Sequence, residues 1–210
     1  PSDSKLLPYR SNVPHLAKFS FCKVDDQFYN RCIENGGGFI VGGDNYGQGS
    51  SREHAALVPN YLKIKAIFAI SFARIHRSNL INNGILPLVI NQKDYDFFND
   101  QDEYELINLL DSVENNKDIT VINKTNNQTI TAKLKLSPRE KTMIQYGGLL
   151  NAIKEYLKSI ISNKKNFMKA VEKEFEKITA LRTSWANSSS VEEKANLNNE
   201  LSGALKTIMA

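Results

Sequence analysis

Apolar runs and helical spacings alternate along the first 150 residues of the chain. Five short apolar runs predict strands, at 38–42, 64–70, 86–90, 119–123 and 129–136. Three helical patterns accompany these runs: two lie between them, at 51–62 and 73–82, and one follows the last run, at 138–146. Alternation of strands and helices predicts an α/β layer in which at least part of the sheet is parallel.

After about residue 150 the pattern becomes helical. Apolar residues recur there in steps of three or four, and then once more at a tryptophan: Met168, Val171, Phe175, Ile178, Trp185. A polar break at 186–190 follows, and Ser190 stands three residues before Glu193, which is the spacing of a capping box. The helix that starts there presents a second apolar set: Leu197, Leu201, Leu205, Ile208. We expect an antiparallel two-helix hairpin that needs a helical partner or the first domain to bury both faces.

The distribution of glycine and proline separates the two parts. Ten of the 11 glycines lie at or before Gly148, and all six prolines lie at or before Pro138. We therefore expect two domains, at 1–156 and 157–210. No stretch of about 18 apolar residues occurs, so no membrane-spanning segment is expected in this chain.

Composition and charge exclude several classes of function. The net charge of +4 is small and the two signs are interspersed, so we expect no nucleic-acid partner. Cys22 and Cys32 are ten residues apart, which is not a metal or redox spacing. The three histidines form no HxxxH pair, and no metal site of the chain's own is expected. Two thiols without a signal peptide predict a reducing compartment, which we take to be the cytoplasm.

The most informative stretch is GGDNYGQGSSREHAALVP, at 42–59. Its glycines let the backbone approach a ligand, and the predicted helix that follows offers free N–H groups and a positive dipole end. Ser50, Ser51 and Arg52 stand at that point, so the segment can receive a carboxylate or phosphate and provide a hydroxyl for proton transfer. The alternative is a purely structural role, in which Ser50 and Glu53 form only a capping box. Neither a GxGxxG fingerprint nor a P-loop is present.

Three motifs together resemble the C-terminal swivel domain of aconitases. They are YGQGSSREHAAL at 46–57, SFARIHRSN at 71–79 and GILPL at 84–88, in the family's order and spacing. The resemblance covers residues 6–154 and implies the β/β/α swivel architecture. The small subunit of isopropylmalate dehydratase also has a GSSREH block, but it continues toward Pro-Trp, whereas Ala55-Ala56-Leu57 favours the aconitase branch.

The resemblance implies roles for individual residues. Ser50 corresponds to the catalytic base, acting as an alkoxide on the proton alpha to a carboxylate of citrate or isocitrate. Ser51 and Arg52 correspond to residues that bind substrate carboxylates. Arg10 matches the other substrate arginine of this domain, with a plain surface arginine as the alternative. The remaining polar residues near the motifs are read as structural or as minor hydrogen-bonding groups: Asn45, His54, Arg74, His76, Asn79.

The family reaction, interconversion of citrate and isocitrate through cis-aconitate in the tricarboxylic acid cycle, implies a 4Fe–4S cluster. Its cysteine ligands belong to other domains, and Cys22 and Cys32 do not match them, so we expect no cofactor-binding residue here. The chain is expected to be inactive without those domains or a cluster-bearing large subunit. Two alternatives stay open: the small subunit of an isopropylmalate, homoaconitate or methylcitrate type hydro-lyase, and a non-enzymatic scaffold that uses the helical tail.

The tail resembles a different family. Residues 165–210, and above all ELSGAL at 200–205, resemble the helical bundle of the LemA family. The alternative is a generic amphipathic hairpin. The resemblance implies an α-helical tail and gives no biochemical role for it.

Overall fold

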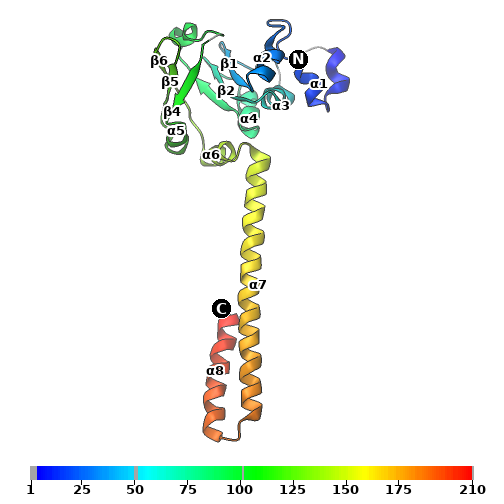
Figure 1. Cartoon of the computed structure of the whole chain (residues 1–210), viewed down its shortest axis with the longest axis vertical. Coiled ribbons are helices and arrows are strands. Elements are labelled where there is room, and N and C mark those ends of the chain that lie inside the picture. Colours follow the sequence, from blue (N-terminus) through cyan, green and yellow to red (C-terminus); the bar gives the residue numbers. More distant parts are fainter. Residues whose placement is uncertain (1–3, 50–51, 101, 210) are drawn as a thin grey trace. The chain divides into compact units, whose positions relative to one another are not determined.

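The computed structural model describes residues 4–49, 52–100 and 102–209, and the chain divides into two compact units, Pro1–Ile153 and Lys154–Ala210 (Figure 1). The first unit contains, in chain order, η1 (Ser4–Tyr9), α1 (Val13–Ala17), α2 (Phe28–Glu34), β1 (Gly38–Gly42), α3 (His54–Tyr61), β2 (Ile64–Ala69), α4 (Arg74–Asn82), β3 (Leu86–Val89), η2 (Gln92–Phe97), β4 (Tyr104–Ile107), α5 (Leu109–Asn115), β5 (Ile119–Asn123), β6 (Thr129–Ala132) and α6 (Pro138–Gln145). Two longer helices, α7 (Leu149–Asn187) and α8 (Val191–Met209), complete the chain.

The first sheet is parallel, in the order β1-β2-β3. Phe39 lies opposite Ala66, and Phe68 opposite Leu88. Helices α3 and α4 connect these strands, so β1, β2 and β3 all end at the same edge of the sheet. The parallel α/β layer predicted from the sequence is confirmed.

The second sheet is antiparallel, in the order β4-β5-β6. The sequence predicted a strand through residue 136, but β6 ends at Ala132. At Lys133 the chain leaves this sheet and pairs with Val89 of β3, through backbone hydrogen bonds of 2.7 and 3.0 Å. The strand therefore ends early because the backbone changes partner from one sheet to the other.

The parallel sheet separates two hydrophobic clusters. On one face, Ile40 and Ile67 pack with buried residues of α1 and α3, among them Leu16 and Ala56. On the other face, the second sheet and α6 pack against β2 and β3: the buried side chains include Phe68, Leu88, Val121, Ala132 and Met143. The first unit thus has a mixed α/β architecture in which helices and a second sheet cover opposite faces of the parallel sheet (Figure 1).

Two helices of the first unit match their predicted ranges and one does not. α4 and α6 form as expected, and Ser137 and Glu140 close a capping box at the start of α6. The helix predicted from residue 51 begins at His54. Glu53 is its N-cap and makes no side-chain capping bond, so it does not take the third helical position that a capping box with Ser50 requires.

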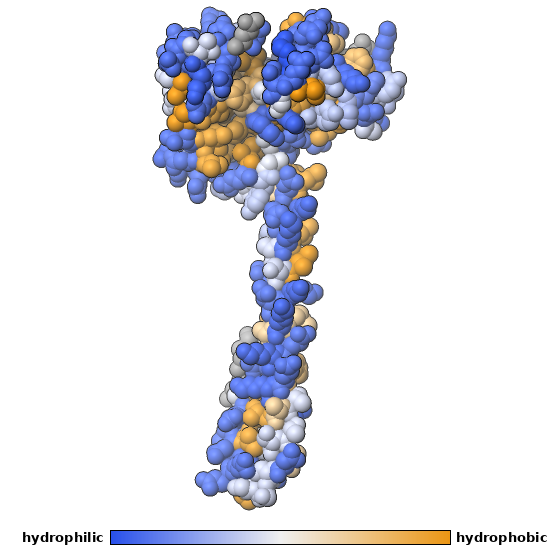
Figure 2. All heavy atoms as spheres, viewed as in Figure 1, coloured by the Kyte–Doolittle hydropathy of each residue, from blue (hydrophilic) through white to orange (hydrophobic). Residues whose placement is uncertain are grey.

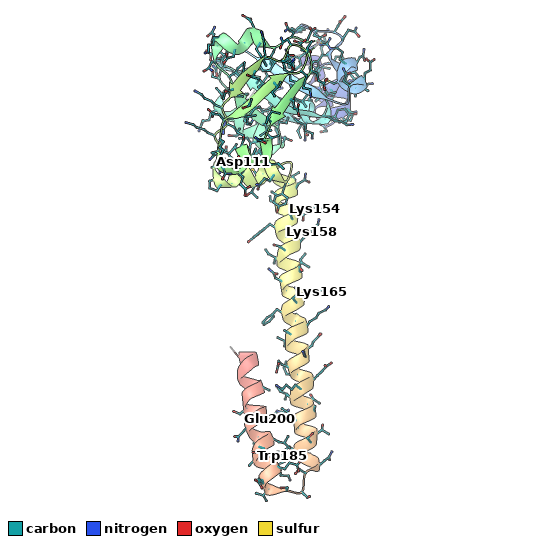
Figure 3. The ribbon with its side chains drawn as sticks, turned by 60° about the vertical axis from the view of Figure 1, so that its left-hand side comes forward. Asp111, Lys154, Lys158, Lys165, Trp185 and Glu200 are labelled. Atoms are coloured by element: carbon teal, nitrogen blue, oxygen red, sulfur yellow. The ribbon has the colours of Figure 1, made fainter. Side chains whose placement is uncertain are left out.

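The second unit is a helical hairpin that begins within α7. α7 ends at Asn187 and α8 begins at Val191, and both views show α8 lying alongside the last part of α7 (Figures 1 and 3). The Ser190 hydroxyl accepts a hydrogen bond from the Glu193 N–H at 3.3 Å, as the predicted cap requires. The Glu193 carboxylate bonds the Ser188 hydroxyl at 2.6 Å. No helix in the described part of the chain has the length and apolar content needed to cross a membrane.

Candidate functional site

Two loops meet at the carboxyl edge of the parallel sheet. The loop after β1 carries residues 43–53, and the shorter loop after β2 carries residues 70–73. The Ile70 N–H donates to the Gly43 carbonyl at 3.2 Å, the Tyr46 N–H to the Ser71 carbonyl at 2.9 Å, and the Ala73 N–H to the Tyr46 carbonyl at 2.9 Å. Ligands of open parallel sheets bind at this edge, so the backbone bonds fix the glycine loop where a site is expected.

The Ser71 side chain adds a second connection between the two loops. Its hydroxyl oxygen accepts a hydrogen bond from the Asn45 N–H at 2.7 Å and donates to the Asp44 carboxylate. Asn45 is in the left-handed region, with φ of 52°. Sequence reasoning overlooked the Asp44–Ser71 pair, although each residue closely follows one of two adjacent parallel strands.

An aromatic cluster lies under the glycine loop. The Tyr46 ring meets Phe72 edge-on at a centroid distance of 6.1 Å and His76 at 5.3 Å. Burial raises the pKa of Tyr46 to about 12, so its hydroxyl is protonated at neutral pH. Neither ring nitrogen of His76 has a hydrogen-bond partner among the described residues, and burial lowers the pKa of this residue. His76 thus lies buried as a neutral ring against the loop, in agreement with the structural role predicted for it.

Two glycines allow the loop to lie on these rings. A Cβ at Gly42 would lie 2.3 Å from the Tyr46 ring, and one at Gly47 would lie 2.2 Å from the His76 ring. Gly47 also has a φ of +88°. Gly43 and Gly49, in contrast, have open space where a Cβ would be. The glycines of this motif therefore serve two purposes, since some accommodate rings below the loop and others leave its outer side uncovered.

The structure describes two of the four predicted site residues. Ser50 and Ser51 lie outside the described residues. Arg52 is exposed in the turn before α3, and its carbonyl accepts a hydrogen bond from the Ala55 N–H at 3.1 Å. Arg10 is exposed in the turn between η1 and α1, and α1 packs on α3. The contacts of the described residues do not join the Arg10 side chain to the glycine loop, so its role stays a prediction.

The donor set of the described residues does not fit a metal centre. No group of three histidine, cysteine, aspartate or glutamate side chains lies close enough to hold an ion there. Cys22 is exposed, whereas Cys32 is buried in the helix-covered cluster, where burial raises the pKa of its thiol. A 4Fe–4S cluster needs several thiolates at one place, and these two cysteines do not provide that.

Comparison with known proteins gives matches to one family. The profile of the aconitase C-terminal domain matches residues 28–93, which include both loops of the site. A probable mitochondrial aconitate hydratase of Dictyostelium discoideum is 43 % identical over 120 residues. That match covers 55 % of this chain and 15 % of the relative, so the chain spans a small part of such aconitate hydratases.

Small subunits are matched over most of their length. The methanogen homoaconitase small subunit of Methanocaldococcus jannaschii is 37 % identical over 162 residues, covering 75 % of this chain and 85 % of the relative. The crystal structure of a 3-isopropylmalate dehydratase from the same organism is 33 % identical with a TM-score of 0.59, covering 73 % of this chain and 83 % of that one. The LemA resemblance of the tail finds no support in these comparisons. The shared fold, the motifs at the sheet edge and the extent of the match to a small subunit show that this chain belongs to the aconitase C-terminal domain family.

Proposed function

We propose that this chain forms the substrate-binding wall of a hydro-lyase that acts on tricarboxylates, with citrate and isocitrate as the first candidates. The observation that carries the proposal is the glycine loop at 43–53, held at the carboxyl edge of the parallel sheet by the loop at 70–73. Both loops lie within the residues that match the aconitase C-terminal domain. The tricarboxylic acid cycle is the corresponding metabolic context.

The proposed chemistry assigns one task to each polar residue of the loop. Ser50 removes the proton alpha to a substrate carboxylate, and its alkoxide needs local positive charge because a serine hydroxyl is a weak base. Arg52, in the turn before α3, supplies that charge and pairs with a carboxylate in bidentate fashion. Ser51 and Arg10 bind the remaining substrate carboxylates. The nearby N-terminus of α3 favours negative charge at the same point.

The proposal includes groups that this chain does not provide. The family reaction uses a 4Fe–4S cluster, which supplies Lewis acid chemistry for loss of the substrate hydroxyl. Because the described residues hold no suitable donor set, the cluster must come from other domains or from a large subunit. We therefore expect the isolated chain to bind substrate without converting it. The cytoplasmic location stays a prediction, since the names of several relatives specify mitochondria.

Calorimetry tests the half-site directly. Tricarballylate and citrate are titrated into the full chain, into Arg52→Ala and into Arg139→Ala, which removes an exposed arginine from α6. Binding by wild type and Arg139→Ala, with a loss of at least about tenfold in Arg52→Ala, would support the proposal. Equal affinities in all three proteins would contradict the role of Arg52. If none of the three proteins bound either ligand, the chain would have no preformed half-site, and the non-enzymatic alternative would be favoured.

A second candidate is the small subunit of a two-chain hydro-lyase. The match over 85 % of a methanogen homoaconitase small subunit favours it. The test is co-purification with a cluster-bearing large subunit, followed by assays with citrate, homocitrate and isopropylmalate. Turnover of homocitrate or isopropylmalate in preference to citrate would establish this candidate and correct the substrate proposed above.

A further inference from the structure

An exposed apolar column runs along residues 157–175 of α7, in the second unit. It consists of Leu157, Ile161, Met168 and Phe175, whose exposed fractions lie between 48 and 67 %. At about 100° per residue these four side chains fall within about 40° of one another around the helix. Figure 2 shows apolar atoms gathered along this helix. Four large apolar side chains on one line are more than the scattered apolar residues of an ordinary surface.

The described side chains of α8 do not cover this column. The helices pack through a different line of α7, where Ile178 is only 4 % exposed, and Ala204 of α8 is buried to the same degree. Phe175, three residues before Ile178, stays 56 % exposed. α8 has 19 residues against 39 in α7, so it reaches only about half of the longer helix.

A row of lysines borders the column on its other side. Lys154, Lys158, Lys165 and Lys169 lie within about 60° of one another, directly next to the apolar column. Figure 3 labels three of them along α7. Residues 154–169 contain five lysines and a single glutamate, Glu155, which pairs with Lys158 at 2.5 Å. This half of α7 is therefore both amphipathic and strongly basic.

Charge and the position of one lysine argue against a second copy of this chain as the occupant. In a parallel pair of α7 helices packed through the column the two lysine rows would meet, and residues 154–169 offer one acidic side chain for five lysines. Lys164 lies within the apolar face, no more than about 40° around the helix axis from Leu157. Two helices packed through this face would bury its ammonium group. At a lipid surface its long side chain reaches the headgroups instead.

We propose that this basic amphipathic face of α7 binds the surface of an anionic phospholipid membrane. The apolar column enters the boundary between headgroups and acyl chains, and the lysine row contacts the negatively charged headgroups beside it. A helix with Lys on one flank and Leu, Ile, Met and Phe on the adjacent face has the composition of helices that lie in such an interface. This inference concerns the second unit and does not depend on the proposed hydro-lyase function.

Vesicle co-sedimentation of the full chain tests the proposal. Vesicles of phosphatidylcholine with about 30 % phosphatidylserine should bind the chain, whereas phosphatidylcholine alone should bind it at least about tenfold more weakly. Lys165→Gln/Lys169→Gln should weaken binding about 25-fold, since each lysine near an anionic surface contributes about fivefold. Ile161→Gln/Met168→Gln should weaken it about tenfold or more by removing buried apolar area.

The matched control is Lys173→Gln/Lys177→Gln, which removes the same charge from the far side of the same helix. It should change binding by less than about threefold. If both lysine double variants lost vesicle binding equally, only the net charge of the chain would matter, and this result would overturn the proposal. So would a wild-type dimer in light scattering that Ile161→Gln/Met168→Gln makes monomeric, because the face would then belong to a second copy. Salt-sensitive binding to an acidic amphipathic peptide, without vesicle binding, would assign it to a protein partner and also overturn the proposal.

Discussion

The Ser71 hydroxyl is the side chain that fastens the glycine loop to the neighbouring strand end. It bonds Asp44 and the Asn45 N–H at once. Ser71→Ala should lower the free energy of unfolding by about 1–2 kcal/mol, because the Asn45 N–H and the carboxylate both lose a partner. Urea unfolding measures this. Ser78→Ala, which removes an exposed hydroxyl of α4 that donates to the Arg74 carbonyl, should cost less than about 0.5 kcal/mol. If Ser71→Ala lost no more unfolding free energy than Ser78→Ala, the loop would not depend on this bond.

His76 makes stability depend on pH in a predictable direction. Burial against Tyr46 and Gly47 lowers its pKa, so the unfolded chain takes up a proton at a higher pH than the folded chain does. The stabilisation is present above pH about 6.5 and is lost as the pH falls toward the lowered pKa. His76→Phe keeps the ring contact and should flatten this slope in urea titrations between pH about 7 and 5. His54→Gln should retain it. An unchanged slope in His76→Phe would contradict the assignment.

At the scale of elements, the sequence revealed those with strong patterns and missed those defined by contacts. The apolar runs at β2 and β3 are largely buried, and the run at β1 is buried or partly buried after Gly38, so all three could be predicted directly. β4 was missed because its four residues show no clear alternation between buried and exposed positions. α5 was missed because it has only seven residues. It is flanked by Asn108 and Asn116, both in the left-handed region. The glycine loop that the sequence singled out lies at the carboxyl edge of the parallel sheet, but its attachment through Ser71 depends on strand register and could not be foreseen.

The turns that end α4 and α6 are packed backbone to backbone. A Cβ on Gly84 would lie 2.5 Å from the Gly147 carbonyl carbon, and Gly84 has a φ of +72°. Gly84→Ala should therefore cost more than about 3 kcal/mol of unfolding free energy, from strain and displacement together. Gly43→Ala is the control, because a Cβ there meets no atom within 4 Å. It should change stability by less than about 1 kcal/mol in the same urea experiment. Similar values for both variants would refute this packing argument.

At the scale of the whole molecule, one helix belongs to both units. The sequence predicted a domain boundary at 156/157, and the structural division falls between Ile153 and Lys154 inside α7. No proline or glycine occurs between Leu149 and Asn187, so nothing in that segment interrupts a helix. A boundary of this kind gives no local signal, since the change is in what the helix packs against.

The two units should unfold separately, and the chain carries a reporter for each. Its single tryptophan, Trp185, lies in the hairpin, with the Lys194 ammonium 4.7 Å from its ring centroid. Cys32 lies in the core of the first unit, and Cys22→Ser leaves it as the sole thiol. The hairpin buries few side chains, so helix packing stabilises it weakly, by about 2 kcal/mol or less. In urea, Trp185 fluorescence should change at a lower concentration than the one at which Cys32 becomes reactive toward a thiol reagent. Coincident transitions would mean that the units form one cooperative body.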